Sequence, residues 1–120
     1  MGRRVLIIDD NSAFRAAARR LLEREGFIVV AEAESGVSGV QEAKTHSPDL
    51  AIVDVQLPDS DGFEVAERLS LLNKGLQVIL TSSLDRADFG ELVAGSSALG
   101  FIPKAELSAP AIEALLAPTR

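Results

Sequence analysis

Hydrophobic residues along the chain alternate between short continuous runs and segments in which they recur at helical spacing. The runs have the length and the β-branched content of buried strands. They are Val5–Ile8, Phe27–Ala31, Leu50–Val53, Val78–Leu80 and Gly100–Ile102. Each run precedes a segment typical of an amphipathic helix, over 13–25, 37–46, 63–72, 86–94 and 109–116. Five strands that alternate with five helices predict a parallel sheet with helices on both faces, the doubly wound α/β class.

Polar and small residues mark the ends of these predicted helices. Asn11 or Ser12 can cap the first helix, and Gly26 is placed to end it. A polar-capped helix is expected to begin at about Arg86. Ser108 is expected to cap the last helix, whose first turn tolerates Pro110.

Composition excludes several classes of protein. The 120 residues are 47% apolar and 25% charged, which is typical of a single globular domain. The chain has no Cys and one His, so disulfides, thiol catalysis and a zinc site are excluded. A formal net charge of −6 argues against direct binding of nucleic acid. No apolar run reaches the roughly 18 residues of a membrane span, and we expect a cytoplasmic location.

Chemically active side chains follow four of the five predicted strands. Asp9 and Asp10 come after the first strand, Asp54 after the third, Thr81 and Ser82 after the fourth and Lys104 after the fifth. In an open α/β sheet these positions share the carboxyl edge, where ligands bind. Converging carboxylates without His or Cys favour Mg²⁺. A metal, a nucleophilic carboxylate, a hydroxyl donor and a cation are what phosphoryl transfer needs.

Four segments together carry a family resemblance. They are VLIIDDNS (5–12), IVDVQLPDSDG (52–62), LTS (80–82) and GFIPK (100–104). In this order and at these intervals they resemble the receiver domain of two-component response regulators. The resemblance covers essentially the whole chain and implies a flavodoxin-like sheet of strand order 2-1-3-4-5. We therefore expect one receiver domain over residues 1–120, without an output domain of its own.

The resemblance also implies a role for each residue of the site. Asp54 would be the phosphoacceptor, and Asp9, Asp10, Asp54 and the backbone carbonyl of Gln56 would hold Mg²⁺. Lys104 would pair with Asp54 and then with the phosphoryl oxygens. Ser82 would hydrogen-bond the phosphoryl group, and Phe101 would turn from solvent toward the core as Ser82 moves. The protein would not be a conventional enzyme, because it catalyses only its own phosphorylation and dephosphorylation.

The implied partners are a sensor histidine kinase or a phosphotransfer protein. Arg15, Arg19, Arg20 and Arg24 give the first helix a basic flank, which is either solvated or a docking surface for the kinase. Phosphorylation would change the surface of the fourth helix, fifth strand and last helix, through which many relatives form homodimers.

Several points stay open at the level of sequence. Ser82 is chosen over Thr81 because it lies 22 residues before Lys104 (from 82 to 104). The family usually has proline after its lysine, in a cis peptide, whereas Lys104 precedes Ala105. A pseudo-receiver that signals by protein contact alone is the main alternative. Adjacent Asp9 and Asp10 argue against a flavin carrier, which needs a phosphate-binding loop there, and against an aspartate-based phosphatase.

Overall fold

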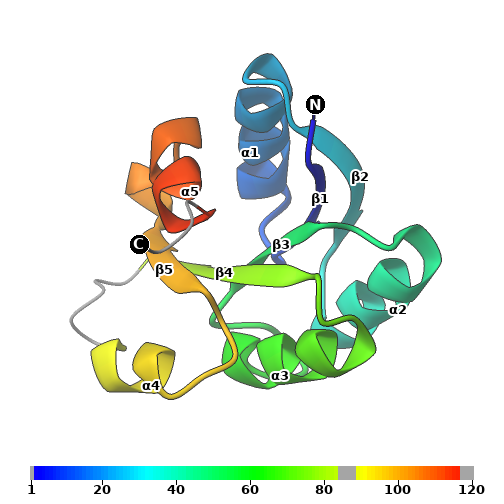
Figure 1. Ribbon diagram of the computed structural model, residues 1–120, viewed down its shortest axis with the longest axis vertical. Coiled ribbons are helices and arrows are strands. Elements are labelled where there is room, and N and C mark those ends of the chain that lie inside the picture. The colour runs from blue at the N-terminus through cyan, green and yellow to red at the C-terminus, as the bar shows by residue number, and fades with distance from the viewer. Residues whose placement is uncertain (1, 84–88, 117–120) are drawn as a thin grey trace.

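The structure, a computed structural model, describes residues 2–83 and 89–116 and alternates strands with helices (Figure 1). The elements are β1 (Arg4–Ile8), α1 (Ser12–Arg24), β2 (Ile28–Ala33), α2 (Gly36–His46), β3 (Leu50–Asp54), α3 (Gly62–Leu72), β4 (Gln77–Ser82), α4 (Gly90–Ala94), β5 (Gly100–Pro103), the 3₁₀ turn η2 (Lys104–Glu106) and α5 (Ala109–Leu116).

The strands form one sheet in the order β2-β1-β3-β4-β5, with every neighbouring pair parallel. β1 and β3 are adjacent at its centre, with Ile8 opposite Val53, and Asp54 lies opposite Thr81 of β4. The predicted fold class and strand order are confirmed. Because the strands are parallel, all five end at the same edge of the sheet.

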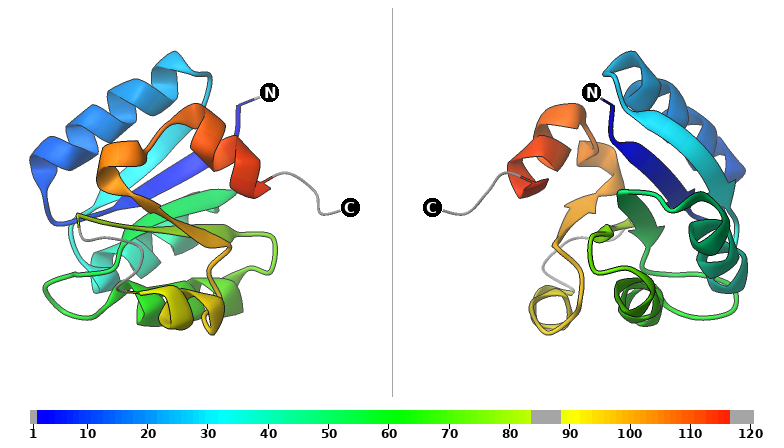
Figure 2. Two further views of the ribbon diagram at one scale, coloured as in Figure 1. Left: turned by 90° about the vertical axis from the view of Figure 1, so that its left-hand side faces the viewer. Right: turned by 45° about the vertical axis from the view of Figure 1, so that its right-hand side comes forward.

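Helices cover both faces of the sheet, α1 and α5 on one and α2, α3 and α4 on the other (Figure 2). Side chains alternate between the faces along each strand, so each face has its own hydrophobic core. Leu22 of α1 and Ile112 of α5 belong to one core, and Val65 and Leu69 of α3 belong to the other. Each fully buried leucine or isoleucine contributes about 1.5–3 kcal/mol through the hydrophobic effect.

Helix caps agree with the predicted starts of α1, α2 and α5. The side chain of Asn11 accepts a hydrogen bond from the Phe14 N–H, and Ser35 and Ser38 form a capping box on α2. The Ser108 hydroxyl accepts from the Ala111 N–H at 3.1 Å. Gly26 follows α1 with a φ of +96°, a left-handed conformation that glycine adopts without steric cost.

Two strands extend two residues further toward the carboxyl edge than the hydrophobic runs predict. β2 continues through Glu32 and Ala33, and β4 continues through Thr81 and Ser82. Ala33 lies opposite Ile8 of β1, and Ser82 lies opposite Pro103 of β5. Pairing with a neighbouring strand therefore extends both elements where side-chain polarity predicts none.

The described residues cover only part of the predicted fourth helix. The expected start at Arg86 lies outside the described residues, and the helix that the structure describes begins at Gly90. Its N-cap residue is Phe89, which makes no side-chain cap hydrogen bond with the described residues. The Phe89 ring packs against those of Phe63 and Phe101, so aromatic packing holds this end of the helix.

Within the residues that the structure describes, no helix has the length and apolar character needed to cross a membrane. All peptide bonds in the same residues are trans, including that between Lys104 and Ala105.

Gly62, the first residue of α3, allows this helix to approach β3 closely. A Cβ atom at this position would lie 2.4 Å from the Asp54 carbonyl oxygen and 2.9 Å from the Val55 Cα atom. Because both are backbone atoms, no side-chain rotation can relieve the overlap.

We predict that Gly62→Ala lowers the free energy of unfolding by about 1–3 kcal/mol, because α3 must move away from β3. Urea denaturation measures the change. Gly90→Ala is the matched control, since a Cβ at Gly90 meets no atom within 4 Å in the part of the chain that the structure describes, and it should leave the stability unchanged or slightly higher. Equal stability of the two variants would contradict the prediction.

Candidate functional site

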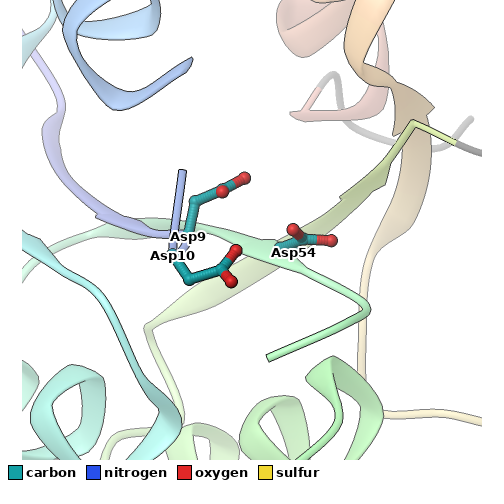
Figure 3. Close-up of side chains that lie close together, drawn as sticks. All are labelled: Asp9, Asp10 and Asp54. Atoms are coloured by element: carbon teal, nitrogen blue, oxygen red, sulfur yellow. The ribbon is translucent and has the colours of Figure 1, made fainter. Parts of the chain in front are cut away.

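The residues predicted to form the site converge at the carboxyl edge of the sheet. Asp9 follows β1, Asp54 ends β3, Ser82 ends β4 and Lys104 follows β5. Figure 3 shows the side chains of Asp9, Asp10 and Asp54 gathered beyond the ends of the two central strands. One carboxylate oxygen from each of these three residues lies within 4.8 Å of the others.

The turn between β1 and α1 holds the first two carboxylates. The Asp9 N–H donates to the Ala33 carbonyl at 2.9 Å, and the Asn11 N–H donates to Asp9 Oδ1 at 2.8 Å. Asp9 is 1% exposed, whereas Asp10 is open to solvent. Backbone hydrogen bonds therefore hold Asp9 in place in this turn, whereas solvent can reach the Asp10 carboxylate.

The basic flank of α1 is partly engaged within the molecule. Arg15 and Arg19 both bind Glu32 of β2, at 3.1 and 2.8 Å, and the Arg15 guanidinium also donates to the Asp9 carbonyl. The hydrogen bond from Arg19 holds the pKa of Glu32 below its usual value, although partial burial opposes this. Arg15 and Glu32 thus support the turn that bears Asp9, a role that sequence analysis missed because β2 was expected to end at Ala31.

Lys104 bridges the two buried carboxylates. Its Nζ atom lies 2.7 Å from Asp9 Oδ2 and 3.2 Å from Asp54 Oδ2. Burial lowers the pKa of Lys104, but its ion pairs with Asp9 and Asp54 outweigh this, and the net pKa is raised. Lys104 is therefore a cation throughout the physiological range of pH.

Asp54 has a raised pKa, chiefly because burial penalises its charged form. The charge of Asp9 raises it further, whereas the Gln56 N–H and Lys104 lower it. Three carboxylates against one ammonium leave an excess of negative charge at this edge. A divalent cation with oxygen ligands would neutralise this excess, so the donor set fits Mg²⁺.

The loop between β3 and α3 is tied to Asp54 at one end and to α2 in its middle. The Gln56 N–H donates to Asp54 Oδ1 at 3.1 Å, which places the Gln56 backbone beside the carboxylates. Further along the loop, both Asp59 carboxylate oxygens accept from the first turn of α2, from Gly36 N–H at 2.8 Å and Val37 N–H at 2.9 Å. These bonds lower the pKa of Asp59, and no local motif in the sequence marks this contact.

The two candidate hydroxyls lie on opposite faces of the sheet. Thr81 alternates with Leu80, shares the face of Ile79 and has a buried hydroxyl oxygen that finds no hydrogen-bond partner among the described residues. Ser82 is fully buried and shares the face of Leu80, whose core also contains Phe101. Of the two, Ser82 is therefore on the same face as the expected switch aromatic.

Phe101 already lies in the core in this structure. It is 3% exposed, and its ring centroid is 5.8 Å from that of Phe89 in a tilted arrangement. The Phe89 ring in turn lies 6.2 Å from that of Phe63. We expected Phe101 to turn inward from solvent, whereas in this structure its ring is already inside and packs against Phe89.

Comparisons with known proteins agree with this geometry. The family model of the response regulator receiver domain matches residues 5–116. A transcriptional regulator of Pseudomonas aeruginosa is 42% identical over 103 residues, which cover 86% of this chain and 50% of that protein. The chemotaxis protein CheY of Bacillus subtilis is 36% identical over 84 residues, 70% of each chain.

Solved structures show the same arrangement. The signal receiver domain of the response regulator NarL from Mycobacterium tuberculosis superposes with a TM-score of 0.85 at 27% identity, covering 98% of both chains.

The virulence-factor transcription regulator BvgA of Bordetella pertussis is 38% identical over 106 residues, 88% of this chain and 51% of BvgA. The chain thus spans about half the length of BvgA and of the Pseudomonas aeruginosa regulator. With the sheet order, the acidic edge and the family match in agreement, this chain belongs to the receiver domains of two-component response regulators.

Proposed function

We propose that this chain is a phosphorylation-dependent switch, in which Asp54 accepts a phosphoryl group from a sensor histidine kinase or a phosphotransfer protein. The observation that carries the proposal is the cluster of three carboxylates, two of which contact the Lys104 ammonium. Phosphoryl transfer depends on positioning and charge neutralisation, and this arrangement supplies both. Phosphoryl transfer from such a kinase implies that the protein acts in the cytoplasm.

Asp9, Asp10, Asp54 and the Gln56 carbonyl would hold Mg²⁺ at this edge. When bound, Mg²⁺ would neutralise the negative charge on the oxygens of the phosphoryl group that is transferred. Asp54 contributes the nucleophile. One of its carboxylate oxygens attacks phosphorus in line with the imidazole of the donor, so the P–N bond breaks as the acyl phosphate forms. Attack of water on phosphorus later releases inorganic phosphate and restores the carboxylate.

Lys104 and Ser82 complete the phosphoryl site. Lys104 lies close enough to Asp54 to donate to the phosphoryl oxygens once the carboxylate becomes an acyl phosphate. Ser82 is favoured over Thr81 as the switch hydroxyl because it lies on the same face of the sheet as Phe101 of the neighbouring strand β5.

The surface of α4, β5 and α5 is the proposed output. Phe101 lies in β5 and Phe89 at the start of α4, so their ring contact links the site to this surface. Phosphorylation would bias the surface toward a second conformation that controls a partner or an output domain outside this chain, which we take to be one receiver domain. The pseudo-receiver is disfavoured because the carboxylates and the lysine of the site are all in place.

We predict that incubation with acetyl phosphate and Mg²⁺ adds about 80 Da, one HPO₃ group, to the wild-type protein and nothing to Asp54→Asn. Intact mass spectrometry measures the gain. Asp49→Asn is the control, because Asp49 lies at the opposite end of β3 and accepts the Arg4 N–H. Labelling of Asp54→Asn to the wild-type level would contradict the assignment of the phosphoacceptor.

We predict opposite effects of two substitutions on Mg²⁺ affinity. Asp10→Asn removes a ligand and a negative charge and should weaken binding, whereas Lys104→Met removes the neighbouring positive charge. A unit charge at about 5 Å contributes on the order of 1–3 kcal/mol, so Lys104→Met should tighten binding roughly tenfold. NMR titration of backbone amides at pH 8 measures both. Unchanged or weaker binding by Lys104→Met would show that Lys104 does not compete with the cation.

We predict that the phosphoryl mimic beryllofluoride with Mg²⁺ promotes a homodimer through α4, β5 and α5. Leu92 and Leu99 supply exposed apolar area there, with exposed fractions of 58% and 39%. Light scattering coupled to size-exclusion chromatography measures the mass. Asp54→Asn should stay monomeric, and equal masses with and without the mimic would exclude this mode of output.

A further inference from the structure

The Lys104 ammonium has a third neighbour besides the two carboxylates. Its Nζ atom lies over the ring of Phe14, 4.6 Å from the ring centroid. A cation at this distance is attracted by the negative face of an aromatic ring, and the attraction grows as water is excluded. The Lys104 side chain is 17% exposed, so much of its hydration has been replaced by these three contacts.

Contacts within the first turn of α1 and with the hydrophobic core fix the position of Phe14. It lies in the first turn of α1, and its N–H donates to the Asn11 side chain at 3.0 Å. Its ring is half-buried against the core beneath α1 and α5. The Asn11 N–H also donates to Asp9, so one turn of backbone positions both a proposed metal ligand and the ring.

A lysine side chain on its own would not keep one position at such a site. It is a flexible four-carbon stem with a strongly hydrated charge. The hydrogen bond to Asp54 must change when the phosphoryl group arrives, whereas the ring of Phe14 does not take part in the chemistry. The ring therefore offers Lys104 a contact that persists through the reaction.

We propose that Phe14 is a positioning residue that holds the Lys104 ammonium at the phosphoacceptor through the face of its ring. The inference rests on the proposed function of Asp54. A core role alone makes leucine an adequate substitute at this position, whereas the proposed role requires an aromatic ring. Phe14→Leu and Phe14→Tyr separate the two.

The first measurement is NMR of the lysine side chains in protein carrying ¹³C-lysine. The chain has three lysines, so Lys44 and Lys74 serve as internal references. A ring beneath the ammonium shifts the Lys104 Cε protons upfield. The shift should disappear in Phe14→Leu and persist in Phe14→Tyr. If Lys104 resonates at the same position in Phe14→Leu as in wild type, the contact does not exist and the proposal is wrong.

The second measurement is the rate of Asp54 phosphorylation at saturating acetyl phosphate and Mg²⁺. Phe14→Leu should lower the maximal rate about threefold to tenfold, as expected from loss of a cation–π contact, with Mg²⁺ affinity unchanged within twofold. Phe14→Tyr should stay within twofold of wild type. Phe27→Leu is the matched control, because Phe27 is buried in the same core and should lose stability without losing rate.

The outcomes distinguish this inference from the proposed function. Wild-type protein that takes up no phosphoryl group would overturn the proposed function and this inference with it. Labelling of wild type with an equal maximal rate for Phe14→Leu would overturn the inference alone. Equal loss of rate in Phe14→Leu and Phe27→Leu would also overturn it, because the effect would then belong to the core.

Discussion

Repulsion among carboxylates at one edge of the sheet is the constraint on which the rest of this structure depends. Asp9 and Asp54 are nearly buried and Asp10 lies beside them, so desolvation and like charge both oppose the folded state. Lys104 offsets this cost by contacting both buried groups. The backbone contributes as well, because the Asn11 and Gln56 N–H groups each donate to one of these carboxylates. What remains is an excess of negative charge, and that excess makes the site suitable for a divalent cation and a phosphoryl group.

The surrounding elements keep this unfavourable arrangement in place. Gly62 lets α3 lie directly against the backbone of Asp54, and Asp59 fastens the same loop to the first turn of α2. On the other side, Arg15 connects Glu32 of β2 with the Asp9 carbonyl. Phe14 adds a ring beneath the Lys104 ammonium. Contacts from α1, β2, α2 and α3 thus hold the carboxylates in place against their mutual repulsion.

The buried aromatic residues show how the site can reach the output surface. Ser82 and Phe101 share a core face, and the rings of Phe63, Phe89 and Phe101 form a continuous contact from α3 through the start of α4 to β5. Phe101 is already inside, so a phosphorylation-dependent change in this protein would proceed by movement of the elements around the ring. Interfaces of packed rings tend to have discrete arrangements, which is what a two-state switch requires.

The sequence by itself determined the succession of strands and helices along the chain and that Asp9, Asp10, Asp54 and Lys104 meet at one edge of the sheet, because hydrophobic period and strand-end position are local properties. Only the tertiary structure decided the rest. The extension of β2 and β4 depends on neighbouring strands, and the faces of Thr81 and Ser82 depend on where the sheet places them. The aromatic cap of α4 and the contacts of Asp59 and Phe14 join segments far apart in the chain. Such contacts have no period and no neighbouring motif, so they become visible only when the sheet brings their elements together.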